Sequence, residues 1–262
     1  MHGSDLQLRL TAAEAVAREA GSLALRHYRR RDLLTIEGKG LQDIVSAADR
    51  EVEDLVRKRL GSLFPDDGVL GEEGGLTSGD AGTWVIDPID GTWCFLNGIG
   101  SWCVALAYVC DGETLIGVIY DPNAGELFTA AKGLGAKLDG EPIRVHAGTK
   151  LSDGTLSVGF SHRSKPEEVA AIFGPLLAAG GMYHRHGSGA LGLAWTACGR
   201  LIGYVEPHMN SWDAIAGMLM VREAGGWTND FLANDGLHQG NRVIAAPPAL
   251  ADQVRALLAW EL

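Results

Sequence analysis

The segment WVIDPIDGT at residues 84–92 constrains the fold of this chain more than any other stretch. An apolar strand runs directly into Asp87 and Asp90, which are three positions apart with Pro88 between them. A proline fixes its own φ and pushes the preceding residue towards extended conformations, so the two aspartates are expected in a stiff turn at a strand end. Two carboxylates that close together repel each other, which indicates a cation between them. The alternative is an Asx-turn with two solvated aspartates.

Further acidic residues stand at loops, strand ends and helix starts. Glu72 and Glu73 lie in the loop sequence GEEGG, Glu206 ends a predicted strand, and Asp213 falls in the first turn of a predicted helix. Each has an ordinary explanation alone, as a solvated loop, a surface carboxylate or a helix-start residue. Together they are typical of a site for several divalent ions. Hard oxygen ligands favour Mg²⁺, Mn²⁺ or Ca²⁺ over zinc, and such clusters serve phosphoryl chemistry.

The first half of the chain predicts two helices followed by an antiparallel meander. Apolar spacing predicts a long amphipathic helix over residues 4–31 and a second helix from Ser46 to Gly61, with Asp49 in its first turn. Residues 64–83, rich in Gly, Asp and Glu, are expected to form an exposed loop. Turn residues separate the strand-like segments that follow, which indicates antiparallel pairing. These segments are residues 83–86, 102–109, 114–120 and 126–131.

After Pro142 strands and helices alternate, which predicts an α/β second half. The expected strands are residues 155–159, 182–185, 202–205 and 242–245, and the expected helices start at 166, 188, 212 and 248. We therefore predict two domains. The first, residues 1–146, holds an antiparallel sheet and the main metal motifs, and the second, residues 147–262, contributes Asp213 and substrate contacts.

Composition excludes several classes of protein. Thirty-three acidic against 22 basic residues give a net charge of −11 in 262 residues, which argues against nucleic acid or an anionic membrane as the main partner. No apolar run approaches the ~20 residues that cross a bilayer, and the N-terminus resembles no signal peptide. Without a signal peptide or a membrane span, a cytoplasmic protein with reduced thiols is expected. The four cysteines form no Cys-x-x-Cys pair, so a zinc site made from them is not expected. Walker A, HExxH and GxSxG motifs are absent.

The motifs taken together resemble the inositol monophosphatase family of metal-dependent sugar and polyol phosphatases. The resemblance lies in DIVSAAD at residues 43–49, GEE at 71–73, WVIDPIDGT at 84–92, GVIYDP at 117–122, ELFTA at 126–130, and WDAIAG at 212–217 with Gly225-Gly226 after it. It implies an α+β (or α/β) fold built as a layered αβαβα sandwich, a smaller version of the fructose-bisphosphatase architecture. It also implies a homodimer and two to three Mg²⁺ ions per active site, with Mn²⁺ as a possible substitute and with lithium sensitivity.

The resemblance also implies residue roles. One metal would be held by Glu72, Asp87 and the Ile89 carbonyl, a second by Asp87, Asp90 and Asp213, and a third, weaker one again by Glu72. Thr92 with Asp49 would orient and activate the water nucleophile, and Glu72, as a ligand beside it, belongs to the catalytic set. Gly91 and Thr92 amides would hold phosphate oxygens, whereas Glu206, the Gly189 backbone and Asp90 would contact substrate hydroxyls. Glu73 is expected outside the direct ligands.

The chain departs from the family pattern after Thr92. Where the family commonly has one residue followed by Asn-Phe, this chain has Trp93-Cys94-Phe95. We expect Trp93 to be packed in the core, the alternatives being that it narrows the pocket or stacks on a substrate ring, and Cys94 to be a small buried side chain. Lys39 lies near the position of a phosphate-facing lysine, and Arg185 is expected to be structural or at an interface. His184 and His186 are expected to be ordinary histidines rather than ligands.

The leading hypothesis is a Mg²⁺-dependent phosphomonoesterase that splits inositol monophosphate by direct attack of water. Sister activities stay open, with histidinol phosphate, fructose bisphosphate or a 3′-phosphorylated nucleotide as the substrate. Glu206 favours a polyol, because a carboxylate accepts hydrogen bonds from hydroxyls. A hypothesis of another class is a non-catalytic binding protein.

Overall fold

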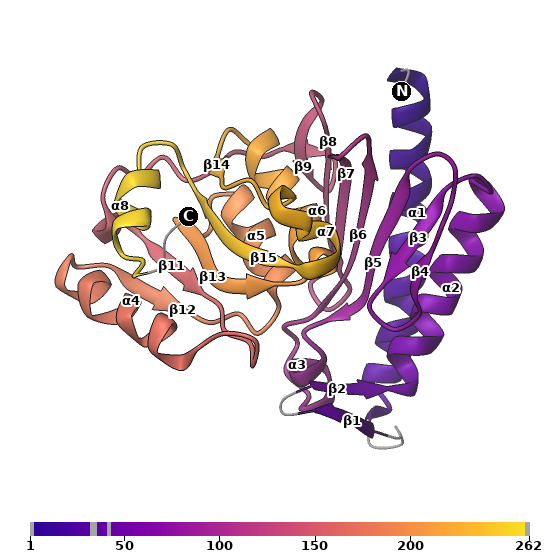
Figure 1. Cartoon of the computed structure of the whole chain (residues 1–262), viewed down its shortest axis with the longest axis horizontal. Coiled ribbons are helices and arrows are strands. Elements are labelled where there is room, and N and C mark those ends of the chain that lie inside the picture. The colour runs from indigo at the N-terminus through magenta and orange to yellow at the C-terminus, as the bar shows by residue number, and fades with distance from the viewer. Residues whose placement is uncertain (1–2, 32–35, 41–42, 260–262) are drawn as a thin grey trace.

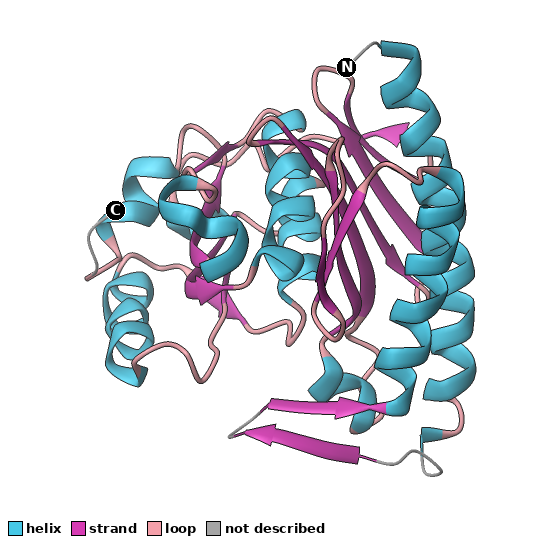
Figure 2. Ribbon diagram, turned by 45° about the vertical axis from the view of Figure 1, so that its right-hand side comes forward, coloured by secondary structure: helices cyan, strands magenta, loops and turns pink. Residues whose placement is uncertain are grey.

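The computed structural model describes residues 3–31, 36–40 and 43–259, with side chains for 3–31 and 47–259, and these form five layers. The layers run helix, sheet, helix, sheet, helix across the molecule (Figure 1; Figure 2). The expected αβαβα sandwich is confirmed. No helix in the described ranges is both long and apolar enough to cross a bilayer.

The first two layers come from the N-terminal half. Helices α1 (Gly3–Tyr28) and α2 (Ala47–Leu63) cover one face of an eight-stranded sheet of order β10-β9-β8-β7-β6-β5-β3-β4 (Figure 1). Neighbouring strands from β5 to β10 pair antiparallel, as the turn residues predict. The strands are β3 (Gly68–Gly71), β4 (Gly75–Thr77), β5 (Thr83–Asp90), β6 (Cys103–Cys110), β7 (Glu113–Asp121), β8 (Glu126–Ala131), β9 (Gly135–Leu138) and β10 (Glu141–Pro142).

Both faces of this sheet are buried, so its central strands carry apolar side chains on both sides. In β5, Trp84 and Ile86 pack towards α1 and α2, whereas Val85 packs towards the middle helices. Strand β6 repeats the pattern, with Leu106 on the first face and Ala105 on the second. Because successive side chains point to opposite faces and both faces are buried, nearly continuous apolar runs form the centre of the sheet.

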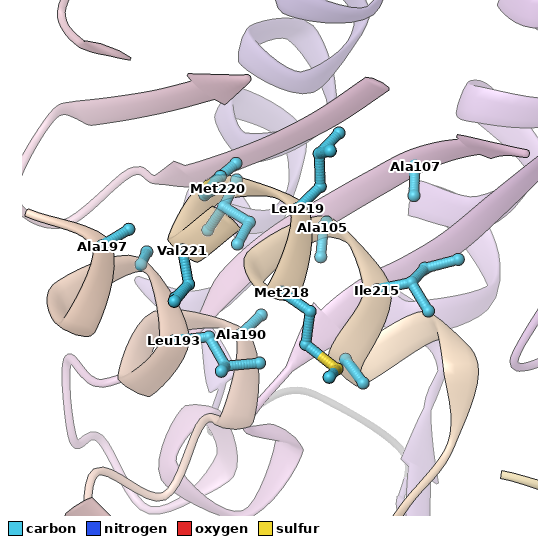
Figure 3. Close-up of a cluster of buried hydrophobic side chains, with 14 of the residues drawn as sticks. Ala105, Ala107, Ala190, Leu193, Ala197, Ile215, Met218, Leu219, Met220 and Val221 are labelled. Atoms are coloured by element: carbon cyan, nitrogen blue, oxygen red, sulfur yellow. The ribbon is translucent and has the colours of Figure 1, made fainter. Parts of the chain in front are cut away.

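The middle layer consists of α5 (Gly189–Ala197) and α6 (Ser211–Glu223), which fill the space between the two sheets. Figure 3 shows their apolar side chains, Leu193 and Val221 among them, meeting each other, with Ala105 and Ala107 of β6 alongside. Alanine on the strand lets the helix layer lie close to the sheet. One core cluster therefore contains residues from both halves of the chain.

The second sheet has the order β12-β11-β13-β15-β14, and α4 (Pro166–Ala178) and α8 (Ala251–Ala256) cover its outer face. Strand β11 (Thr155–Val158) is parallel to β12 (Met182–His184) and β13 (Gly203–Met209), while β15 (Asn241–Ala246) is antiparallel to β13 and to β14 (Trp227–Thr228). The remaining elements are α3 (Thr92–Leu96), α7 (Gly236–Gln239), η2 (Leu151–Asp153), η3 (Ala233–Asp235) and the hairpin β1 (Ile36–Gly40) with β2 (Asp43–Ser46).

The expected exposed loop over residues 64–83 is wrong in part. It contains β3, a buried strand that pairs parallel with β5 and antiparallel with β4. Only two apolar residues, Val69 and Leu70, mark this strand, so tertiary pairing and not local pattern decides it. The second helix also differs, because Ser46 belongs to β2 and the helix continues past Gly61 to Leu63.

The proposed domain division at residue 146 stays a prediction. The eight-stranded sheet ends at Pro142 and the five-stranded sheet begins at Thr155, so each sheet comes from one side of that boundary. The middle core cluster contains residues from both sides.

Candidate active site

Asp87 and Asp90 lie at the end of β5, where its pairing with β6 shifts register. At this irregularity the Ile89 amide donates to Asp87 Oδ1 at 3.0 Å, across Pro88. Both carboxylates are buried, with 1% and 7% of the residue exposed. Where a turn was expected, β5 continues to Asp90 with a shift of register. The Ile89–Asp87 hydrogen bond has the Asx-turn pattern of the alternative interpretation, but the two aspartates are buried and not solvated.

Asp90 is anchored by the start of α5, about a hundred residues later in the chain. Its Oδ2 accepts from the Ser188 hydroxyl at 2.5 Å and from the Ala190 amide at 2.7 Å, and its Oδ1 accepts from the Gly189 amide at 3.3 Å. A carboxylate at a helix N-terminus is stabilised by the unpaired amides there. Sequence reasoning missed Ser188 as a partner, since only its position before a helix marks it.

Asp213 joins the two from the first turn of α6, where the Asn210 amide donates to its Oδ2 at 3.3 Å. One carboxylate oxygen from each of Asp87, Asp90 and Asp213 lies within 4.8 Å of the others. Oxygen donors at that separation suit a hard divalent cation. The residues therefore fit a metal site, and Asp213 comes from the opposite half of the chain.

Burial raises the pKa of every member of this cluster, and repulsion between carboxylates adds to the effect at Asp87 and Asp90. The pKa of Asp87 lies well above its usual value because of burial, then of the charges on Glu72, Asp213 and Asp90. Burial and the Asp213 charge raise the pKa of Asp90 to about 7, and burial raises that of Asp213. Without a cation the three groups resist ionising together; a bound divalent ion would offset both causes.

Glu72 lies in the turn between β3 and β4 and lines the same pocket as the cluster. Its amide donates to the Ile86 carbonyl at 3.3 Å, which ties this turn to β5. The pocket measures about 530 Å³. It brings together seven of the residues that the sequence predicts: Glu72, Asp87, Ile89, Asp90, Gly91, Thr92 and Asp213.

Thr92 begins α3 at the edge of this pocket. Its hydroxyl lies 3.1 Å from the Ile89 carbonyl and 3.4 Å from Asp49 Oδ1, so the predicted pair of Thr92 and Asp49 is in contact. Gly91 before it has a φ of +95°, and a Cβ there would lie 2.7 Å from the Ser101 carbonyl oxygen. Only glycine fits this position without strain.

Glu206 and Gly189 line a smaller pocket of about 120 Å³, which shares Asp90 and Asp213 with the larger one. Glu206 Oε2 accepts from the Tyr204 hydroxyl at 2.6 Å. Burial raises the pKa of Glu206 to about 8, which the Tyr204 hydrogen bond partly opposes. The two residues predicted to contact substrate hydroxyls, Glu206 and Gly189, thus lie next to the carboxylate cluster.

Several side chains around the pocket differ from expectation or add to it. Trp93 is 51% exposed and lines the larger pocket, so the expectation that it packs in the core is wrong. Cys94, the next residue of the short helix α3, is buried as expected. Arg163 and Arg185 line both pockets. They bring positive charge that acidic composition did not suggest.

Other predicted residues lie apart from the cluster. The Glu73 amide donates to Glu53 at 2.8 Å, and the residue is not among those lining the pockets. His186 is buried against Trp195 and Ser101 at the wall of the smaller pocket, outside the carboxylate cluster, and burial lowers its pKa to about 4. The Lys39 side chain and those of residues 43–46 fall outside the part of the chain that the structure describes.

The chain is thus a layered α+β protein of the αβαβα type with a cluster of three carboxylates that could hold a metal ion. Residues 5–261 match the Inositol monophosphatase family, and the chain belongs to that family.

Relatives and solved structures agree with this assignment. The chain is 42% identical over 221 residues to the "Nus factor SuhB" of Xylella fastidiosa, covering 84% of this chain and 80% of that protein. It is 36% identical to the protein of the same name from Haemophilus influenzae, covering 91% of each. The crystal structure of extragenic suppressor protein suhB from Bartonella henselae superposes with a TM-score of 0.91 at 32% identity, covering 97% of this chain and 100% of that one. The Thermotoga maritima IMPase gives 0.85 at 32% identity, covering 95% and 96%.

Proposed function

We propose that this protein is a Mg²⁺-dependent phosphomonoesterase that hydrolyses inositol monophosphate to inositol and phosphate. The observation that carries the proposal is the approach of the Asp87, Asp90 and Asp213 carboxylates within 4.8 Å beside a pocket of about 530 Å³. Mg²⁺, or Mn²⁺ in its place, would lower the pKa of a water molecule and neutralise charge on the phosphate and the leaving oxygen.

The ligand assignments of the resemblance fit the donor set. Asp87, Asp90 and Asp213 offer carboxylate oxygens and Ile89 a carbonyl oxygen, all hard ligands suited to Mg²⁺. Glu72 lies in the same pocket and interacts electrostatically with Asp87. We propose that these five residues hold two to three ions.

The other residues act on the substrate. Thr92, in contact with Asp49, holds the attacking water and passes its proton towards that carboxylate. The amides of Gly91 and Thr92 bind phosphate oxygens. Glu206 and the Gly189 backbone hold hydroxyls of the departing polyol in the smaller pocket, next to Asp90.

Phosphate release from a substrate panel tests this function. The panel is inositol monophosphate, histidinol phosphate, fructose bisphosphate and a 3′-phosphorylated nucleotide, each with Mg²⁺ and with EDTA. We expect release that stops with EDTA and is fastest for inositol monophosphate. A higher kcat/KM for another member would move the assignment to that sister activity, and no Mg²⁺-dependent release from any would overturn it.

A second candidate function follows from the relatives that carry the name Nus factor SuhB, one of them 42% identical to this chain. We infer that a binding role as a Nus factor is the main alternative. An Asp87→Asn variant separates the two: it removes a carboxylate from the metal cluster but leaves the surface unchanged. If cells that carry only the Asp87→Asn variant keep the Nus-factor activity of the wild type, that activity depends on binding and not on phosphate hydrolysis. The expectation that nucleic acid is no partner stays a prediction under either role.

The remaining expectations from the resemblance are also proposals. We propose a homodimer in the cytoplasm whose phosphatase activity lithium inhibits, since a small cation would replace a weakly held Mg²⁺. Light scattering and a lithium titration of phosphate release test the first and last of these.

A further inference from the structure

A buried glutamate on α2 accepts hydrogen bonds from the turn that carries Glu72. Glu53 is 1% exposed, its Oε2 accepts from the Glu73 amide at 2.8 Å, and its Oε1 accepts from the Gly74 amide at 2.8 Å. These two amides directly follow Glu72 in the chain. The single carboxylate thus holds the backbone on the C-terminal side of a predicted metal ligand.

Arg57, one helical turn further along α2, binds both Glu53 and the same turn. Its Nε donates to Glu53 Oε1 at 2.6 Å and its Nη2 to the Gly75 carbonyl at 2.5 Å. Charge-assisted hydrogen bonds of this kind are shorter and stronger than neutral ones. The ion pair therefore fixes the β3–β4 turn against α2 at three successive residues, 73 to 75.

The glycines of the turn give the carboxylate its place. A Cβ on Gly71 would lie 2.4 Å from Glu53 Oε1, and a Cβ on Gly74 would lie 2.7 Å from the same atom. Two glycines of the GEEGG sequence therefore leave the space that the Glu53 carboxylate occupies. Any side chain at residue 71 or 74 would push the carboxylate away.

The same face of α2 reaches the other side of the site. Asp49 is four residues before Glu53, is also 1% exposed, and lies 3.4 Å from the Thr92 hydroxyl. Residues four apart lie on one face of a helix. One rigid helix therefore holds the Glu72 turn through Glu53 and contacts Thr92 through Asp49.

We propose that Glu53 is a positioning residue that sets the Glu72 carboxylate against Asp87, and so determines metal affinity without touching metal or substrate. This inference rests on the proposed function only in that Glu72 is a metal ligand. Residues that orient metal ligands typically change affinity by about 10–100-fold when they are lost. The phosphate and leaving-group contacts come from other elements, so they stay in place.

The test uses Glu53→Gln, which keeps the size of the side chain. The amide group of the glutamine retains one acceptor, so one of the two backbone amides loses its partner and Arg57 loses its counter-charge. We would measure the Mn²⁺ dissociation constant of the metal-free protein by electron paramagnetic resonance, its Tm in EDTA, and the Mg²⁺ dependence of kcat. The expected result is a Mn²⁺ dissociation constant raised about 10-fold or more, with kcat at saturating Mg²⁺ within a few-fold of wild type.

Glu51→Gln is the matched control, because Glu51 is an exposed glutamate on the same helix that contacts His27 at 2.8 Å. It should bind Mn²⁺ as wild type does. Arg57→Lys is the second variant in case Glu53→Gln does not fold: it keeps a charge beside Glu53 but loses the contact with Gly75. It should weaken Mn²⁺ binding by a smaller factor.

A lower Tm with an unchanged Mn²⁺ dissociation constant, in whichever of these two variants folds, would show a purely structural role and overturn the inference. Mn²⁺ binding needs no turnover, so the two proposals fail separately. Wild-type protein that binds Mn²⁺ but hydrolyses none of the panel would contradict the phosphatase function and leave the role of Glu53 standing.

Discussion

At the scale of single residues, we propose unequal tasks for the carboxylates of the candidate site. Asp87 is shared between the predicted metal ligand sets, whereas Glu206 lies in the adjoining pocket with Tyr204. Asp87→Asn should lower kcat by more than about 100-fold, since loss of a direct ligand exceeds the loss of an outer partner. Glu206→Gln should mainly raise KM. Steady-state kinetics at saturating Mg²⁺ measure both, and equal losses of kcat would argue against these roles.

Gly91 tests how far one backbone conformation controls the site. Gly91→Ala would strain a φ of +95° and press a Cβ against the Ser101 carbonyl, so we expect a loss of about 1–3 kcal/mol of unfolding free energy. We also expect a large fall in kcat, because Thr92 follows directly. Gly112→Ala is the control: it has a φ of +74° but open space around it. If both variants lose kcat equally, the position of Gly91 is not special.

At the scale of elements, a buried ionic cluster attaches α1 to the large sheet. Arg9 Nη2 donates to Asp67 Oδ1 at 3.0 Å, and the same carboxylate accepts from Trp84 Nε1 at 3.0 Å and Tyr108 OH at 3.1 Å. The Arg9 guanidinium also lies over the Phe64 ring. Burial, and then the Asp67 charge, raise the pKa of Tyr108 to about 12.

Asp67→Asn should therefore destabilise the fold strongly, by about 3 kcal/mol, because it removes the buried partner of Arg9 and leaves this mostly buried side chain with only the more exposed Asp5 as counter-charge. Denaturant unfolding measures this change. Glu19→Gln breaks an exposed ion pair of Glu19 with Arg59, which joins α1 to α2, and should change the midpoint little. A similar small effect for Asp67→Asn would mean that the cluster adds nothing to the attachment of α1.

Sequence reasoning recovers those elements whose pattern is local. The helices and the meander are predicted by apolar periodicity and turn residues. The pairing of Asp87 with Asp90 is predicted by their spacing around Pro88 at the end of an apolar segment. Strand β3 was missed because its pairing with β5 decides it. Ser188 and Glu53 were missed because their partners are set by tertiary contacts, with Asp90 98 residues from Ser188 and Glu73 20 residues from Glu53. The positions of such partners become visible only in three dimensions.

At the scale of the whole molecule, buried carboxyl groups make the stability of the metal-free protein depend on pH. Asp90 and Glu206 have pKa values of about 7 and about 8 in the folded protein, above their usual 3.8 and 4.5. Over this interval the folded state binds more protons than the unfolded state, so the free energy of unfolding falls as pH rises.

The Tm in EDTA should therefore be higher at about pH 5 than at about pH 8.5. Glu206→Gln should make the decline shallower, since glutamine does not titrate. Excess Mg²⁺ should raise the Tm most at the higher pH, where the carboxylates are ionised and ready to bind it. A Tm that is the same at both pH values in EDTA would show that these groups titrate normally in the folded protein.

The middle helices α5 and α6 pack against both sheets, and the carboxylate cluster draws on the chain before residue 91 and after residue 212. Neither half contains the complete carboxylate cluster or a fully covered sheet. A gene split within residues 147–154 would therefore yield two fragments that are each inert and prone to aggregate. Coexpression of the two fragments should yield a soluble complex with the activity of the intact chain, and divalent ions should favour its assembly.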